Sequence, residues 1–279
     1  AKTLFPYTTL FRSADEKAET VNEHPVVAQL FSSHPEYMRQ ACKLVAELGF
    51  DGVDINMGCP VDIINKQGAG ASLIRTPDLA VAVIKAAQEA AGDMPVSVKT
   101  RIGYNKIEYK EWLPHILACN VPALTIHLRT RKEMSDVPAH WELYKEIKDF
   151  CKGLAPNTFV IGNGDVKDLD DAKDKYSNQD IVAEGVMIGR GAFGSPWRFD
   201  WNKKDHTLKE KLNIMLEHTK LYEERLGDIK SFAIMKKHYK AYVNGFSGAK
   251  ELREKLFECK DYQEVLQCTN EFLSKMETE

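Results

Sequence analysis

Short apolar stretches that alternate with stretches of helical spacing constrain the fold of this chain more than any other feature. Six strands are predicted, at residues 25–31, 51–57, 95–101, 123–127, 158–162 and 185–188. The segments between them, at residues 34–48, 77–91, 107–118, 141–151 and 169–176, show the spacing of helices. Strands that alternate with helices in this way predict a parallel sheet covered by helices.

Polar residues gather at the carboxyl ends of these strands and distinguish two kinds of sheet. They are Gln29, Asn56, Cys59, Lys99, Arg101, His127, Arg129, Asn163, Asp165 and Arg190. An open doubly wound sheet concentrates its site where the strand order reverses, whereas a barrel draws on the end of every strand. The sequence therefore predicts an α/β fold of the (β/α)8 TIM-barrel type. Because eight strands close such a barrel and six are found, we expect the barrel to lack its first one or two strands.

Three segments are expected along the chain. Residues 1–13, AKTLFPYTTLFRS, fit no later pattern and are interpreted as a possible non-native leader. Residues 14–199 hold the predicted barrel, which is the catalytic domain. Residues 200–279 are predicted to form an all-α bundle of three or four helices, because they show helical spacing and no strand signal, for example at Leu212, Met215, Leu216, Thr219 and Tyr222.

Charge and cysteine content exclude several classes of protein. The formal net charge is -3, so a site for a polyanion must be a local patch. The six cysteines form no CxxC pair, which argues against zinc-ribbon and thioredoxin-type sites and favours a reducing compartment. No apolar run approaches the ~18 residues of a membrane span, and no signal peptide opens the chain. The sequence thus predicts a cytoplasmic protein without a metal site.

Cys59 is the first candidate for chemistry. The stretch FDGVDINMGCPVDIINKQGAGASL, residues 50–73, alternates as a strand does and then breaks at Gly58-Cys59-Pro60. A cysteine at the mouth of a buried strand, three residues after Asn56, is a candidate catalytic residue. The alternative is that Cys59 is a small buried hydrophobic residue, as many free cysteines are.

Charged residues at other strand ends indicate an anion-binding mouth. Lys99 ends a strand and needs an anion, an electron-rich ring or a carboxylate on a neighbouring strand. His127 is flanked by Arg129 and Arg131, which favours an anion-lined pocket, although a lone histidine is more often a core residue. Arg190 follows a glycine and suits phosphate, because a guanidinium can bind bidentately; a salt bridge is the alternative. The glycine-rich ends GNGD and IGRGA are typical of phosphate sites in barrels.

A basic segment lies in the helical region. Between Asp228 and Glu251 there are five lysines and no acidic residue. Tyr239, Tyr242 and Phe246 are interleaved with them. This composition suits an RNA backbone together with surfaces for base stacking. The alternative is a solvated lysine face beside core aromatic residues at helical spacing.

Seven motifs in register, and an eighth in the tail, resemble those of the tRNA-dihydrouridine synthases, flavin enzymes with a (β/α)8 barrel and a C-terminal helical domain. The tail motif is MKKHYKAYVNGFSGAKELR, residues 235–253. The others are VAQLF (27–31), DINMGCP (54–60), GAGASL (68–73), VSVKTRIG (96–103), TIHLRTR (125–131), IGNGD (161–165) and GVMIGRGAFGSPW (185–197).

The resemblance implies that FMN lies across the barrel mouth, that NADPH reduces it, and that hydride then passes to C6 of a uridine in tRNA. It also implies that Cys59 gives a proton to C5 and that Asn56 helps to position the base. The implied flavin contacts are Gln29, Lys99 and His127. The implied phosphate end consists of Asn163, Gly164, Asp165, Gly189 and Arg190. Contacts with tRNA are expected from Arg101, Arg129, Arg131, Lys236, Lys237 and Lys240, and the protein is expected to be a monomer.

Two departures from the family and two alternative functions stay open. The family's first strand, with an APM-type sequence that touches the flavin, is absent, as is the next strand. Many members carry a lysine shortly after GCP; here Asp62, Ile63 and Ile64 follow, so its role moves to Lys66 or disappears. One alternative is an FMN barrel enzyme for a free pyrimidine, similar to dihydroorotate dehydrogenase. The other is a non-catalytic RNA-binding relative.

Overall fold

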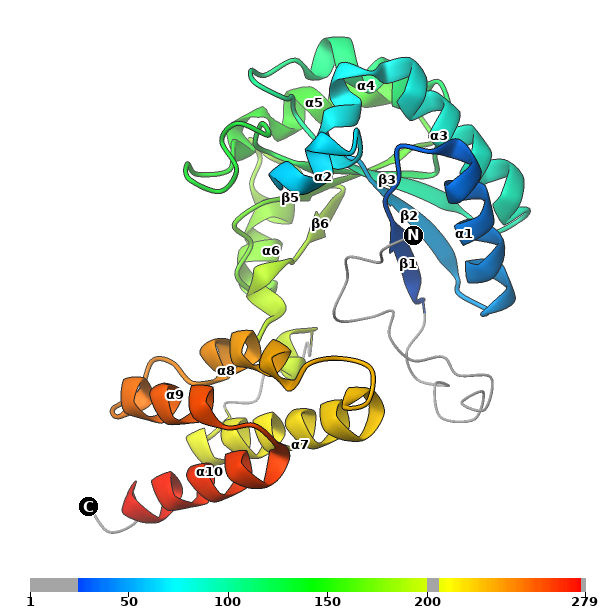
Figure 1. The fold of residues 1–279 in the computed structure, drawn as a ribbon. Coiled ribbons are helices and arrows are strands. Elements are labelled where there is room, and N and C mark those ends of the chain that lie inside the picture. Colours follow the sequence, from blue (N-terminus) through cyan, green and yellow to red (C-terminus); the bar gives the residue numbers. More distant parts are fainter. Residues whose placement is uncertain (1–24, 200–205, 277–279) are drawn as a thin grey trace. The chain divides into compact units, whose positions relative to one another are not determined.

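The computed structural model describes residues 25–199 and 206–276 (Figure 1). The predicted leader, residues 1–13, and the predicted domain junction at residue 200 lie outside this part of the chain. The described residues form two compact units. Residues 25–166 and 170–188 make the first unit, and residues 167–169, 189–199 and 206–276 make the second. Each unit has its own hydrophobic core.

Six parallel strands form the sheet of the first unit. They are β1 (Val27–Leu30), β2 (Gly52–Asn56), β3 (Val96–Arg101), β4 (Ala123–His127), β5 (Phe159–Asn163) and β6 (Gly185–Met187). Every strand predicted from the sequence is therefore confirmed, with small differences at the ends. The strands lie in the order β1-β2-β3-β4-β5-β6, and each pair of neighbours is parallel.

The strand order confirms the predicted class of α/β fold. A doubly wound sheet reverses its order at a switch point, which is where its ligand binds. Here each strand pairs with the next strand of the sequence, without a reversal, as in a (β/α)8 barrel. The carboxyl ends of all six strands therefore lie along one edge, so each can add a side chain to the same site.

The predicted helices of the first unit are also present. They are α1 (Pro35–Glu47), α3 (Pro77–Ala91), α4 (Tyr109–Leu117), α5 (Tyr144–Leu154) and α6 (Leu169–Ser177). Two short elements, α2 (Asp62–Lys66) and the 3-10 helix Gly70–Arg75, occupy the stretch in which the sequence indicated a loop. They were missed because a single helical turn is too short to show a periodic pattern.

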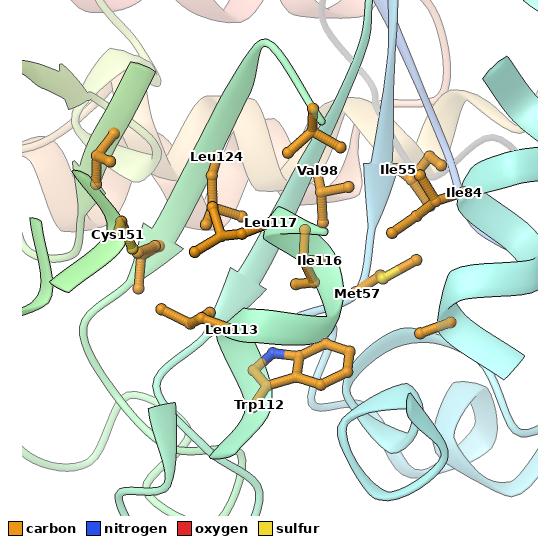
Figure 2. Close-up of a cluster of buried hydrophobic side chains, with 14 of the residues drawn as sticks. Ile55, Met57, Ile84, Val98, Trp112, Leu113, Ile116, Leu117, Leu124 and Cys151 are labelled. Carbon is orange, nitrogen blue, oxygen red and sulfur yellow. The ribbon is translucent and has the colours of Figure 1, made fainter. Parts of the chain in front are cut away.

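The core of this unit lies between the sheet and its helices. Alternate residues of a strand point to opposite faces, so every second side chain faces the helices. Ile55 of β2, Val98 of β3 and Leu124 of β4 are fully buried in one cluster with Trp112 and Leu113 of α4 (Figure 2). Because this face is apolar, the polar residues between these positions are left on the opposite face.

The second unit is helical, as predicted. Its main helices are α7 (Leu208–Leu226), α8 (Lys236–Tyr242), α9 (Ala249–Glu258) and α10 (Tyr262–Met276). Tyr239 and Tyr242 are buried in its core, and Phe246 packs against that core. The interpretation of Tyr239 and Tyr242 as base-stacking surfaces is therefore wrong. These aromatic residues are core residues at helical spacing, as the alternative predicted, whereas the role of the lysines stays a prediction.

Candidate active site

A row of polar side chains lines the sheet face that points away from the helices. Strand register places Asn56 of β2 beside Lys99 of β3, Arg101 of β3 beside His127 of β4, and His127 beside Asn163 of β5. These residues alternate with the buried apolar positions of the same strands, so the period of two that builds the core also gathers the polar residues. The first unit thus carries a polar surface at the carboxyl ends of its strands.

The loop that carries Cys59 is fixed on both sides of the cysteine. Asn56 Oδ1 accepts hydrogen bonds from the backbone N–H groups of Gly58 and Cys59, both at 3.0 Å. The Cys59 carbonyl accepts from Asn65 Nδ2 at 2.9 Å and from the backbone N–H of Ala71 at 3.0 Å. The cysteine itself is partly exposed and forms no disulfide. The structure therefore presents a free thiol on a rigid loop, which favours the catalytic interpretation over a buried small hydrophobic residue.

Gly70 packs directly against this loop. Its φ is +63°, a left-handed conformation in which glycine avoids the strain that a side chain would bring. A Cβ atom at this position would come within 2.9 Å of the Cys59 carbonyl oxygen and 3.0 Å of Cys59 Cβ. The glycine of the GAGASL motif is thus needed for close approach to the cysteine.

A chain of hydrogen bonds leads from Asn56 into the interior. Asn56 Nδ2 donates to Gln29 Oε1 at 2.8 Å, and Gln29 Nε2 donates to Asp54 Oδ2 at 2.5 Å. Ser97 Oγ donates to the other oxygen of Asp54 at 2.7 Å. Gln29 and Asn56, both predicted for the site, are therefore in direct contact. The Asn56 side chain makes all these hydrogen bonds within the protein, so its role in positioning a base stays a prediction.

Lys99 is the partly buried cation of the polar face. Burial, with a smaller contribution from the charge of Arg101, lowers the pKa of Lys99 to about 8, while Asp54 and Cys59 oppose the shift. Its ammonium group has no hydrogen-bond or ion-pair partner among the residues that the structure describes. A desolvated donor without a partner is costly unless a ligand supplies an acceptor. The position of Lys99 therefore fits a bound group with electron-rich acceptor atoms, such as the ring system of a flavin.

Arg129 organises the neighbouring strand ends. It is buried, forms an ion pair with Asp165, and donates to the Val137 carbonyl at 2.6 Å. Its guanidinium also lies 3.1 Å from His127 Nε2. A guanidinium has no acceptor, so His127 Nε2 must accept this hydrogen bond and the ring must carry its proton on Nδ1. The arrangement thus selects the neutral Nδ1–H form of His127.

Arg101 and Arg131 also have partners within the protein. Arg101 is buried and donates to the carbonyls of Gly58 at 2.7 Å, Thr130 at 2.8 Å and Met134 at 3.0 Å. Burial, as the main cause, lowers its pKa to about 10. Arg131 forms an ion pair with Asp62, and its Cζ atom lies 5.4 Å from the centre of the Tyr104 ring. Arg101 and Arg129 thus brace loops of the first unit; their predicted contacts with tRNA are not supported by this burial.

The predicted phosphate end is divided between the two units. Asn163 Nδ2 donates to the Met187 carbonyl at 3.0 Å, and the Gly164 carbonyl accepts from Trp141 Nε1 at 2.8 Å. Both interactions are inside the first unit. Gly189 and Arg190 belong to the second unit, so their expected place beside Asn163 and Gly164 stays a prediction. The lysines predicted to contact tRNA lie on α8; Lys237 and Lys240 are exposed and Lys236 is partly exposed.

Three polar residues of the site were missed in the sequence. Asp54 and Ser97 take part in the chain that holds Gln29, and Asn65 holds the carbonyl of Cys59. A signal for Asp54 was available, because it lies two residues before Asn56 and so on the same face of the strand. Ser97 and Asn65 had no comparable signal, since their contacts depend on strand pairing and on the short helix α2.

The described residues, 25–199 and 206–276, also bear on the metal and membrane predictions. No group of three or more His, Cys, Asp and Glu side chains in these ranges is arranged to hold a metal ion. No helix within them is long and apolar enough to cross a membrane.

Comparisons with known proteins agree with the geometry. Residues 7–277 match the family model described as dihydrouridine synthase (Dus). A probable tRNA-dihydrouridine synthase of Staphylococcus aureus (strain Mu50) is 42% identical over 258 residues, which cover 92% of this chain and 77% of that protein. The probable tRNA-dihydrouridine synthase 2 of Bacillus subtilis (strain 168) is also 42% identical, over 92% of this chain and 78% of that protein.

Solved structures give weaker matches. An old yellow enzyme homologue from Zymomonas mobilis is 16% identical with a TM-score of 0.41, and the match covers 62% of this chain and 52% of that one. Morphinone reductase is 15% identical with a TM-score of 0.40, over 57% of this chain and 45% of that one. Each match thus covers only about half of the solved protein. The family model and the curated relatives show that the chain belongs to the dihydrouridine synthase family.

Proposed function

We propose that this protein reduces uridines in tRNA to 5,6-dihydrouridine, with FMN as its flavin and NADPH as the reductant. The observation that carries the proposal is the rigid presentation of the Cys59 thiol beside the polar sheet face. Family membership supplies the reaction class, and the curated relatives are named for tRNA as the substrate. Free pyrimidine as the substrate is disfavoured by this membership, and loss of catalysis is disfavoured by the intact Cys59 loop.

The residues present fit a flavin. Lys99 offers an ammonium group without a partner in the described part of the chain, and its lowered pKa, about 8, shows how strongly burial disfavours that charge. Gln29 and His127 lie on the same face, at the ends of β1 and β4. We propose that these three residues hold FMN, with Asn163, Gly164 and Asp165 toward its phosphate; Gly189 and Arg190 keep their predicted role in phosphate binding.

The reaction adds two hydrogens across the C5–C6 double bond of uracil. Reduced FMN, when bound, supplies the hydride that C6 receives. The Cys59 thiol gives its proton to C5, so that the C5–H bond forms as the S–H bond breaks and the thiolate keeps the electron pair. Lys99, whose charge interacts with Cys59, stabilises that thiolate. The protein's own tasks are thus to orient the base, hold the thiol and supply one proton.

The finer assignments rest on the same proposal. NADPH as the reductant, a monomeric state and a cytoplasmic location are inferred from the resemblance and the composition. Three lysines of α8, Lys236, Lys237 and Lys240, are proposed to bind the tRNA backbone, because backbone phosphates attract clustered cations of this kind.

Replacement of Cys59 tests the proposal. The full chain is mixed with FMN, separated by gel filtration, and assayed with NADPH and unmodified tRNA; the visible spectrum reports flavin, and the mass gain of uridine reports reduction. Wild type should retain flavin and form dihydrouridine. Cys59→Ala should retain flavin and lose about 100- to 10,000-fold in rate, as expected for removal of a general acid.

Cys259→Ala is the matched control, because Cys259 is also free and partly exposed but lies in the second unit. It should keep the wild-type rate. A Cys59→Ala protein with full activity would remove the proton-donor role, and a flavin-loaded wild type that leaves tRNA unchanged would remove the proposed reaction.

A further inference from the structure

Asp54 stands at the start of the hydrogen-bond chain that ends at Cys59. It is 7% exposed, and Gln29, its partner, is 8% exposed. Asp54 Oδ2 accepts from Gln29 Nε2, Gln29 Oε1 accepts from Asn56 Nδ2, and Asn56 Oδ1 accepts from the N–H groups of the cysteine loop. The side chains of Asp54, Gln29 and Asn56, here called the polar chain, therefore form one connected unit.

The polar chain has a direction. A side-chain amide has one end that donates and one that accepts, so Gln29 and Asn56 can each be turned in two ways. A carboxylate that receives Gln29 Nε2 leaves Gln29 Oε1 for Asn56. This in turn leaves Asn56 Oδ1 for the loop. Asp54, which accepts at one end, and the backbone N–H groups of Gly58 and Cys59, which donate at the other, therefore favour the same direction for every link.

The reverse direction would place donors against donors. If Gln29 and Asn56 both turned over, Asn56 Nδ2 would face the backbone N–H groups of Gly58 and Cys59. Two donors that face one another without an acceptor leave buried polar groups unsatisfied, which is the costly case. Because Asp54 and Gln29 are both buried, water has little access to hydrogen-bond the polar groups left unpaired. The cysteine loop therefore depends on an acceptor at residue 54 facing Gln29.

Other charges around Asp54 agree with this role. Ser97 Oγ donates to Asp54 Oδ1 from the neighbouring strand, and Lys99 interacts with the Asp54 charge. Burial raises the pKa of Asp54, while Ser97, Gln29 and Lys99 oppose the shift. The direction of the polar chain holds in either ionisation state, because a proton on Oδ1 would still leave Oδ2 as the acceptor for Gln29.

We propose that Asp54 is a positioning residue for Cys59: its carboxyl group sets the direction of the Asp54–Gln29–Asn56 chain and so presents an acceptor to the backbone of the cysteine loop. Asp54 acts through Gln29 and Asn56 and need not touch the substrate. The inference rests on the proposed function only in taking Cys59 as the proton donor.

The test measures the alkylation rate of each cysteine thiol separately. The full chain, equilibrated with FMN, is alkylated with iodoacetamide, and mass spectrometry gives a rate for each site. Asp54→Asn removes the charge, and an asparagine whose oxygen keeps the hydrogen bond from Ser97 offers its amide N–H to Gln29, which reverses the polar chain. Asp54→Ala removes the charge but offers no donor. Asp54→Asn combined with Gln29→Glu restores an acceptor for Asn56, because the introduced carboxylate would accept from both neighbours.

Cys59 should be alkylated about fivefold faster in Asp54→Asn than in wild type, because the cysteine loop opens. A factor of about five is expected for the loss of one hydrogen bond. Asp54→Ala should show a smaller increase, and the double variant should return to within about twofold of wild type. Cys259, in the second unit, should keep its rate in every variant. Asp149→Asn, an exposed carboxylate on α5, is the control for the substitution type and should change nothing.

The opposite results would overturn the proposal. They are an unchanged Cys59 rate in Asp54→Asn, equal rates in Asp54→Asn and Asp54→Ala, or a double variant that does not return toward wild type. If Asp54→Asn does not fold, a folded double variant with the wild-type rate still supports the proposal. A double variant that is unfolded or altered at Cys59 rejects it.

Kinetics separate this inference from the proposed function. In an enzyme that reduces tRNA, Asp54→Asn should lower kcat while KM for tRNA stays unchanged, and the double variant should recover part of kcat. A wild type without uridine reduction, but with the expected alkylation pattern, would reject the proposed function and keep the role of Asp54. A wild type that reduces uridine, together with an Asp54→Asn variant whose Cys59 alkylation rate is unchanged, would keep the proposed function and reject the role of Asp54.

Discussion

The two units use charged side chains in different ways. In the first unit the basic groups of the sheet face are buried or partly buried and most have defined partners, as Arg129 has in Asp165, His127 and Val137. In the second unit the lysines of α8 stand at the surface, with Lys237 and Lys240 exposed. The aromatic residues between them, Tyr239 and Tyr242, are in the core.

This difference teaches how each unit should respond to mutation. Buried charges act as sets, so removal of one member leaves another without its partner and costs far more than its own contacts. The attraction between an exposed lysine and a polyanion is screened by salt, so the effects of such lysines should be small and roughly additive. Substitutions in the first unit should therefore affect stability or one chemical step, and those on α8 should affect binding strength and its salt dependence.

The largest effect is expected at the ion pair that the buried Arg129 forms with Asp165. Asp165→Asn should lower the free energy of unfolding by about 3 kcal/mol, because it leaves the buried Arg129 charge without its carboxylate. Asparagine tolerates the left-handed backbone of this position, where φ is +55°, so the charge is what changes. Urea unfolding of the full chain provides the measurement.

The control for Asp165→Asn is an exposed pair in the second unit. Arg198 Nη1 and Asp168 Oδ2 lie 3.9 Å apart, and the two aspartates are almost equally exposed, but the Arg198 side chain is 30% exposed against 3% for Arg129. Asp168→Asn should therefore cost less than about 1 kcal/mol. Equal costs for the two substitutions would contradict the distinction between buried and exposed charges.

Lys99 should show an opposite sign for stability and for ligand binding. Lys99→Met should weaken FMN binding by about 10- to 100-fold, because a charge-assisted hydrogen bond is lost. It should raise the free energy of unfolding at pH 7, because a desolvated ammonium without a described partner is removed. Flavin titration and urea unfolding measure the two effects. A loss of stability equal to the loss of affinity would speak against a ligand-facing lysine.

The same lysine predicts a pH dependence. Its pKa is about 8 in the folded protein against 10.5 for an ordinary lysine, so between these values the unfolded chain binds more protons. The contribution of Lys99 to the wild-type free energy of unfolding should therefore rise as pH increases from about 8 to 10.5, and this gain should be lost as pH falls back through 8. The stability gap between Lys99→Met and wild type should narrow over this range. If the difference in the free energy of unfolding between Lys99→Met and wild type stayed constant over this range, Lys99 would be a solvated lysine with an ordinary pKa.

The smallest effect per residue is expected on α8. Replacement of Lys236, Lys237 and Lys240 by Ala should weaken tRNA binding by about tenfold in total and reduce the salt slope by about one for each lysine that contacts a phosphate. Filter binding at several salt concentrations measures both. Tyr239→Phe is the control; its side chain is buried, so tRNA affinity should not change. An unchanged slope in the triple variant would mean that these lysines only solvate the surface.

Much of the fold could be predicted because it depends on local patterns. The strand at Ala123–His127 and the helix at Pro77–Ala91 have the bounds that the sequence predicted. Alternation within a strand and the proline and glycine at helix ends are local signals. The short helix α2 was not predicted, because five residues carry no period. The proximity of Asn56 and Cys59 could be predicted from the sequence, since only Met57 and Gly58 lie between them.

The partners of the charged residues could not be predicted in the same way. Arg101 looked like a contact for RNA, but the fold surrounds it with the carbonyls of Gly58, Thr130 and Met134. These groups are distant in the sequence, and only strand pairing and loop folding bring them within hydrogen-bond distance. The interpretation of Tyr239 as a stacking surface was wrong for a related reason, because the second core is built from four helices.

The sequence by itself determined the order of strands and helices, the family, and the residue types at each strand end. It could do so because the periods of strands and helices, and the motif spacing, are properties of neighbouring residues. The tertiary structure decided that Asp54 supports Gln29, that Arg129 fixes the tautomer of His127, and that Lys99 has no protein partner in the described ranges. Those outcomes depend on burial and on pairing across strands, which set the cost of each unpaired polar group.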